Sequence, residues 1–143
     1  MLRKVIQITL TAAILIASNI AAAEPAADGS LKQIMQQLGK DYSSLNHAIL
    51  IEDFDAAASA AHAIAYHDKP SLGQRLKVLS ELGSEMPAFK KADDKVHDLA
   101  ITIEDAAKAK DMSLLIQQQS QMLAACMFCH TNYRSKVVNL LGN

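Results

Sequence analysis

Apolar side chains recur every three or four residues along most of the chain, which is the periodicity of amphipathic helices. Ser30 and Asp53 are N-cap residues in front of two such patterns. Four long helices are therefore expected, covering approximately residues 30–51, 54–69, 87–109 and 111–137. No stretch alternates apolar and polar residues with a period of two, so no sheet is expected.

The lengths of the connections predict how these helices are arranged. The first and last links are short, so each joins an antiparallel pair of helices. The middle connection, of about eighteen residues, is long enough to cross one end of the molecule, and we expect a helical turn or two in it from Ser71 to Leu82. The predicted fold is an all-α, up-down-up-down four-helix bundle.

The beginning of the chain has the pattern of a secretory signal peptide. Arg3 and Lys4 precede an apolar run from Val5 to Ala17, and small residues at 21–23 form a cleavage site. The alternative is a membrane anchor, but a run of about thirteen residues is shorter than the roughly twenty that span a bilayer. We expect residues 1–23 to be removed, leaving a periplasmic domain of residues 24–143 without a stable membrane anchor.

Composition narrows the class of protein. The domain that remains has 120 of the 143 residues, which suits one domain with a single core. Loss of the two basic residues changes the formal net charge from −1 to −3. A weakly acidic balance gives no support to nucleic-acid binding, so no nucleic-acid partner is expected.

The most specific motif is Cys126-Met127-Phe128-Cys129-His130, which contains the only two cysteines of the chain. C-x-x-C-H is the attachment signature of a c-type haem, in which the two thiols form thioethers with the haem vinyl groups. The adjacent imidazole becomes the proximal iron ligand. We therefore expect one covalent haem c, bound through Cys126 and Cys129, with His130 on the iron.

Two other interpretations of the motif remain open. Thiol-disulfide oxidoreductases also use C-x-x-C, but with the first cysteine at a helix N-terminus after a strand, which lowers its pKa. Cys126 is instead expected in the middle of a helix. A zinc site could use Cys126, Cys129 and His130, but the sequence offers no obvious further ligand pair.

Counting residues from the predicted turns indicates which side chains lie level with His130. This slice of the bundle is at the end crossed by the middle connection, and it contains Met35, Tyr66 or His67, and Met86 or Phe89. Three other methionines, at positions 112, 122 and 127, share the helix of His130 and cannot reach the opposite haem face. Met35 is the expected distal ligand, with Met86 and His67 as alternatives.

The motif and its position, continued by Thr131-Asn132-Tyr133-Arg134, resemble the class II c-type cytochromes, meaning cytochrome c′ and its low-spin, methionine-ligated relatives. In that family the first helix supplies the residue over the distal haem face, and the matching position is Met35. The basic residue usual before it is matched only by Lys32. The resemblance implies that Arg134 lies near the haem, although this position equally suits a solvated charge at a helix end.

These features predict a function and its alternatives. Iron with His and Met ligands passes single electrons, so we expect an electron carrier with redox partner proteins and not an enzyme. The alternatives are a five-coordinate haem that binds nitric oxide or carbon monoxide, and a haem-free thiol redox protein. Tyr133 is expected to pack, and three histidines are expected to be ordinary surface or boundary residues: His47, His62 and His97. A homodimer is conceivable through an alanine-rich helix face, formed by Ala57, Ala58, Ala61 and Ala65, which equally suits packing within one chain.

Overall fold

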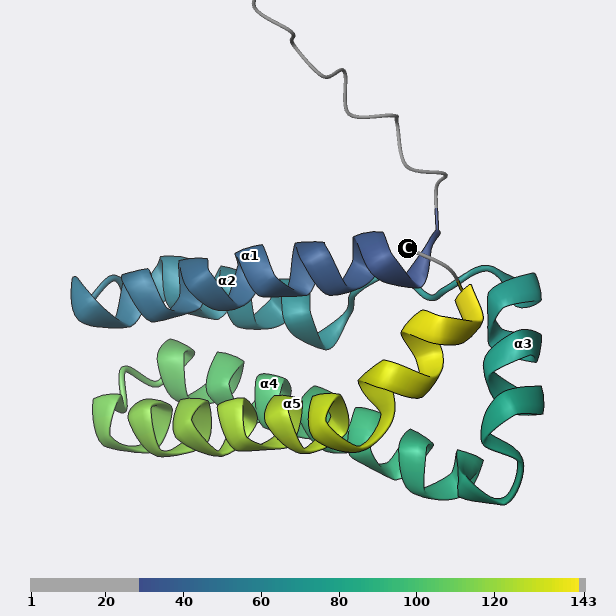
Figure 1. The fold of residues 1–143 in the computed structure, drawn as a ribbon. Helices are drawn as coiled ribbons and strands as arrows, with labels where there is room; N and C mark the ends of the chain where they lie inside the picture. Colours follow the sequence, from purple (N-terminus) through teal and green to yellow (C-terminus); the bar gives the residue numbers. More distant parts are fainter. Residues whose placement is uncertain (1–28, 142–143) are drawn as a thin grey trace, which may run out of the picture.

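The computed structural model describes residues 29–141, and this part of the chain is helical and contains no strand. The helices, shown in Figure 1, are α1 (Leu31–Leu50), α2 (Phe54–Ala65), α3 (Leu72–Leu82), α4 (Met86–Lys108) and α5 (Met112–Leu141), and a 3₁₀ turn over Gly83–Glu85 joins α3 to α4. The prediction of an all-α fold is confirmed. The predicted signal peptide at residues 1–23 lies outside the described residues.

Local sequence signals set the ends of several helices. Ser30 and Gln33 form a capping box at the start of α1, in which each side chain bonds to the backbone N–H of the other residue. Asp53 and Ser71 cap α2 and α3 through their side-chain oxygens. Gly83 ends α3 with a φ of +48°, a conformation that glycine adopts without steric cost.

The connection between α2 and α4 differs from the prediction in two ways. Helix α2 ends at Ala65, with Tyr66 as its C-cap, instead of continuing to residue 69. Pro70 disfavours helical backbone only at Lys69 and does not by itself account for the earlier end. The expected turn or two after Ser71 is a complete helix of 11 residues, α3. Its first turn is anchored to α1, since the side-chain oxygen of Gln74 accepts a 2.7 Å hydrogen bond from the backbone N–H of Leu31.

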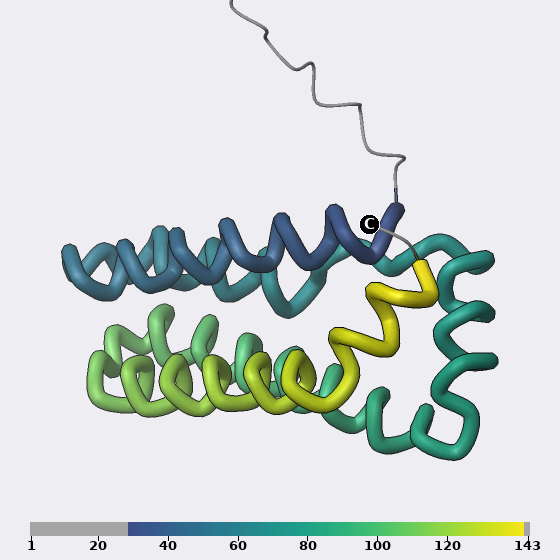
Figure 2. The backbone as a smooth tube through the Cα atoms, in the orientation of Figure 1, coloured from purple at the N-terminus to yellow at the C-terminus, as the bar shows by residue number. Residues whose placement is uncertain are grey.

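The helices form two layers, with α1 and α2 in one and α4 and α5 in the other (Figure 1). Chain direction alternates from each of these helices to the next, as predicted, and α3 stands across one end of both layers. Figure 2 shows that the last part of α5 bends away from the axis of its first part and runs toward the start of α1. Both termini of the described chain therefore lie at the α3 end.

The buried side chains form two separate clusters. The larger cluster joins α1, α2, α4 and α5, and its largest fully buried members are Leu45, Ile103, Leu115 and Met122. The smaller cluster joins α3 to the end of α5 and consists of Val78, Leu82, Tyr133 and Val137. The core is thus divided along the bundle axis, and the division falls near the end that α3 covers.

Close packing of α2 against α4 depends on small side chains. Both helices contribute several buried alanines to the larger cluster: Ala57, Ala61, Ala65, Ala100, Ala106 and Ala107. Side chains that end at Cβ let neighbouring helix backbones approach closely, and α2 and α4 pack along much of their length. The alanine face that was considered for a dimer is therefore used within the chain, and Ala58 also packs against this cluster.

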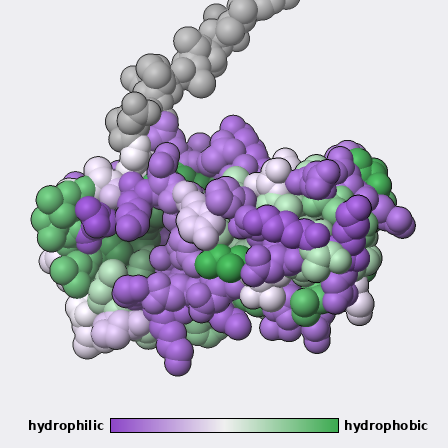
Figure 3. Space-filling model, turned by 180° about the vertical axis from the view of Figure 1, so that it is seen from behind, coloured by the Kyte–Doolittle hydropathy of each residue, from purple (hydrophilic) through white to green (hydrophobic). Residues whose placement is uncertain are grey.

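The face drawn in Figure 3 is largely hydrophilic, and apolar side chains gather on it at the end where α3 lies. Leu72, Leu76 and Leu79 are each about half exposed on that helix. Among the helices of residues 29–141, none has the length and apolar character needed to cross a membrane.

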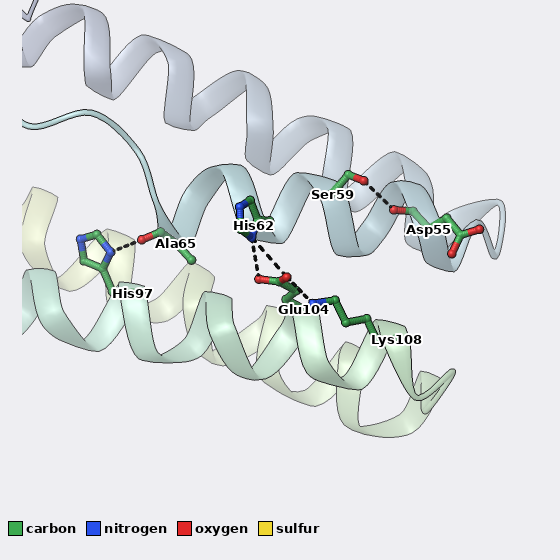
Figure 4. A network of polar contacts seen from close by, with 7 residues as sticks. All are labelled: Asp55, Ser59, His62, Ala65, His97, Glu104 and Lys108. Atoms are coloured by element: carbon green, nitrogen blue, oxygen red, sulfur yellow. Dashed lines mark hydrogen bonds and ion pairs between the residues drawn. The ribbon is translucent and has the colours of Figure 1, made fainter.

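Glu104 on α4 is a buried charged residue that ties two helices together. Its carboxylate accepts a 2.5 Å hydrogen bond from Lys108 Nζ and lies 3.1 Å from Nδ1 of His62 on α2 (Figure 4). The bond from Lys108 lowers the pKa of Glu104, and this effect exceeds the opposing effect of burial. The ionised carboxylate is therefore the form that the fold favours.

This lowered pKa predicts how stability depends on pH. A carboxyl whose pKa is lower in the folded state stabilises the fold above its unfolded pKa, and the contribution is lost as pH falls through the folded pKa. Glu104→Gln should cost about 1 kcal/mol at neutral pH, because its partners are exposed and screened. Urea unfolding at pH 7 and below pH 4 measures this, and the difference between the two proteins should shrink in acid.

Candidate haem site

A hydrogen bond fixes how α1 and α5 are aligned. Gln119 Nε2 on α5 donates to the hydroxyl of Tyr42 on α1 at 2.6 Å. Met35 is seven residues before Tyr42, and Cys126 is seven residues after Gln119. Because the two helices are antiparallel, Met35 and Cys126 lie at the same level, each about 10 Å from the bond along the helix axis. Seven residues are two helical turns, so both residues are on the faces that the bond joins.

The side chains of the C-x-x-C-H motif lie where the two core clusters meet. Cys126 is half-buried against the larger cluster, and Cys129 is half-buried against the smaller one. Met127 and Phe128 are more than half exposed. His130, one turn beyond Cys126, is also exposed. The motif therefore turns both thiols inward between two apolar clusters and leaves the imidazole accessible.

The backbones of α1 and α5 make fewer close contacts than those of α2 and α4, and longer side chains, such as Leu45 and Leu115, fill the space between them. Helices α1 and α5 do not pack along their lengths as the other neighbouring pairs do, and their ribbons stand apart in Figure 1. Met35, on the face of α1 that carries Tyr42, is 38% exposed and belongs to neither core cluster. A thioether on α1 and an imidazole on α5 thus border the same side of the bundle, about one helical turn apart in level.

Other residues predicted for the haem slice occupy different places. Met86 and Phe89 are half-buried beside Cys129, and the ring of Phe89 meets that of Tyr133 edge-on at 5.3 Å. The expectation that Tyr133 packs is confirmed, because it is 6% exposed. Tyr66 is 63% exposed and its ring lies against His62 instead of facing the cysteines.

His67 follows the end of α2 and stacks on His97 of α4, with 4.8 Å between ring centroids. Arg134 and Lys32 are exposed, as is His47. His62 and His97 have defined structural partners, since His62 lies beside Glu104 and His97 bonds to a backbone carbonyl of α2. Sequence reasoning treated both as ordinary surface or boundary residues. The four-residue spacing of Asp93 and His97 places both on one helix face, and this was the sequence signal that could have indicated their association.

The electrostatics of the cysteines disfavour thiol redox chemistry. Burial raises the pKa of the Cys129 thiol to about 11, with further contributions from Asp93 and Cys126. Burial also raises the pKa of Cys126. Tyr42 has a raised pKa as well, first through burial and then through its proximity to Cys126. A nucleophilic cysteine needs a lowered pKa, so these thiols lack the activation that a thiol-disulfide oxidoreductase requires.

Neither the metal-ligand grouping of the structure nor the groove between α4 and α5 includes the two cysteines. Within residues 29–141, the grouping of three metal-ligating side chains that the structure brings together excludes all three motif residues. A groove between α4 and α5 of about 700 Å³ is lined in part by Phe128 and Ala124. Phe128 is nine residues from Gln119, which places it on the opposite side of α5. The groove therefore faces away from the α1–α5 side.

Comparison with known proteins does not assign this chain to a family. No family model, curated protein or solved structure matches this chain. The resemblance to class II c-type cytochromes thus depends on Cys126, Cys129 and His130, on their place in the last helix, and on the all-helical bundle.

The raised pKa of Cys129 predicts slow alkylation of haem-free protein. A shift from 9.0 to about 11 lowers the thiolate fraction at neutral pH by about 100-fold. Iodoacetamide labelling followed by peptide mass spectrometry measures the rate at each cysteine. Asp93→Asn should speed labelling of Cys129 because it removes a nearby negative charge, and Asp94→Asn should not. Equal rates in all three proteins would contradict the contribution assigned to the charge of Asp93.

Proposed function

We propose that this protein is a periplasmic c-type cytochrome that carries single electrons through one covalently attached haem. The observation that carries the proposal is the position of both thiols of a C-x-x-C-H motif, which are half-buried at the junction of two apolar clusters. When bound, haem supplies an iron that gains and loses one electron.

The donor set on the α1–α5 side of the bundle fits such a group. Cys126 and Cys129 provide two thiols at the spacing that thioether attachment needs, and His130 provides an imidazole on the same helix. Met35 provides a thioether from the opposite helix, so protein donors are available for both faces of the ring. The apolar side chains of Phe89 and Tyr133, next to Cys129, would exclude water from part of the ring.

Each residue has a distinct part in this proposal. The two cysteines would anchor the group to α5. His130 and Met35 would supply an imidazole and a thioether to the iron, and iron with both ligands carries single electrons. Redox partner proteins would then exchange electrons with the iron through the part of the haem that remains exposed.

One observation favours the second candidate, a five-coordinate haem that binds nitric oxide or carbon monoxide. Leu31 is eleven residues before Tyr42, and His130 is eleven residues after Gln119, so the alignment set by the 2.6 Å bond puts Leu31 level with His130. Met35 is offset by about one turn, roughly 6 Å. An apolar Leu31 opposite the histidine would leave the distal position free for a small gas.

Covalent attachment is tested by mass. After expression in a periplasm that has haem ligation machinery, the intact mass should equal the chain from Glu24 plus one haem, because two thioethers survive denaturation. Acidified acetone should leave the haem on the protein. Cys126→Ala together with Cys129→Ala should abolish covalent haem while the helix content by circular dichroism persists. A wild-type mass without haem would contradict the proposed function.

The distal ligand is tested by spectroscopy. Met35→Leu keeps an apolar side chain of similar size but removes the sulfur, so the reduced protein should bind carbon monoxide and its reduction potential should fall. Visible spectra with and without carbon monoxide measure the first effect, and redox titration measures the second.

Met86→Leu is the matched control, because Met86 also lies near Cys129 but on α4. It should leave the spectrum and carbon monoxide binding unchanged, as should His67→Ala. A change in Met86→Leu alone would assign the distal ligand to Met86. High-spin wild-type protein that already binds carbon monoxide would favour the gas-binding candidate.

A further inference from the structure

Three potential metal ligands converge outside the candidate haem site. His67 lies just after α2, and Asp93 and His97 lie one turn apart on α4. One ligand atom from each side chain falls within 4.8 Å of the others. The Oδ2 atom of Asp93 is 3.6 Å from Nε2 of His97. This grouping joins the connection after α2 to the middle of α4.

Hydrogen bonds orient both imidazoles for ligation. Nδ1 of His97 lies 2.6 Å from the carbonyl oxygen of Ala65, and the pair is drawn in Figure 4. Nδ1 of His67 lies 2.7 Å from the carbonyl oxygen of Asp68. A carbonyl can only accept, so each Nδ1 carries the hydrogen, and Nε2 of the neutral ring keeps its lone pair. Metal-ligating histidines are commonly held by this type of second hydrogen bond.

The spacing is close to what a tetrahedral cation requires. Two ligand atoms at about 2.0 Å from zinc are roughly 3.3 Å apart. The pair formed by Asp93 and His97 is therefore already near the required separation. The largest separation in the grouping, 4.8 Å, has to shrink by about 1.5 Å, and His67 lies with Asp68 in the connection after α2, where a small backbone shift can provide this and keep their hydrogen bond.

We propose that His67, Asp93 and His97 form a site for one divalent transition-metal cation, with Zn²⁺ as the representative ion. Two imidazoles and a carboxylate are the donor types that zinc prefers, and water would fill the fourth position. The cation would cross-link the connection after α2 to α4. It would also neutralise Asp93, whose charge acts on Cys129. The site is distinct from the haem donors and does not depend on the proposed function.

Zinc titration of the full exported chain tests the proposal. After treatment with a chelator, isothermal titration calorimetry with zinc chloride should give one site per chain. Binding should raise the unfolding midpoint, because a ligand that binds the folded state stabilises it. Asp93→Asn keeps the size of the side chain and should weaken binding by at least about tenfold. His67→Ala should have a similar effect.

Matched variants separate this site from other zinc ligands. Asp94→Asn changes the neighbouring carboxylate, which instead pairs with Lys90, and His47→Ala removes an exposed histidine on α1. Both variants should bind zinc as the wild type does. Absence of binding at millimolar zinc, or unchanged binding in both Asp93→Asn and His67→Ala, would overturn the proposal. Loss of binding only on replacement of Cys126 and Cys129 would move the site to the motif and also overturn it.

Discussion

Close packing between α2 and α4 is the constraint on which the rest of the structure depends. Buried alanines let these two helices approach on one side of the bundle. On the other side, α1 and α5 meet through longer side chains, and among the described residues Gln119 and Tyr42 form the hydrogen bond that joins them. The two layers are therefore tight along α2–α4 and spread along α1–α5. The motif cysteines and Met35 border the spread side.

Much of the fold could be predicted from the sequence because its signals are local. The three-and-four periodicity, the caps at Ser30 and Asp53, and the short links between antiparallel pairs all act within a few residues. The middle connection was less predictable. Ser71 and Gly83 indicate where a helix could begin and end, but the full length of α3 depends on contacts with α1 and with the distant end of α5.

The residues of the candidate site could be predicted from the sequence, but the level of Met35 on α1 relative to the motif on α5 could not. C-x-x-C-H identifies Cys126, Cys129 and His130 whatever the fold. Counting from the turns put Met35 level with His130, whereas the bond between Tyr42 and Gln119 puts Met35 level with Cys126. Counting assumes straight helices that start in one plane, and a bond between side chains 77 positions apart leaves no local pattern. The His67, Asp93 and His97 grouping escaped prediction for the same reason.

Because its two sides are packed unequally, the bundle is held more rigidly along α2–α4 than along α1–α5. A single hydrogen bond contributes only about 1 kcal/mol net, so little polar energy resists separation at the opposite edge. Separation of α1 from α5 would leave the alanine contacts between α2 and α4 in place. It would also expose apolar side chains of the larger cluster, such as Leu45 and Leu115, so burial of these side chains, and not the hydrogen bond, holds the two layers together at this edge.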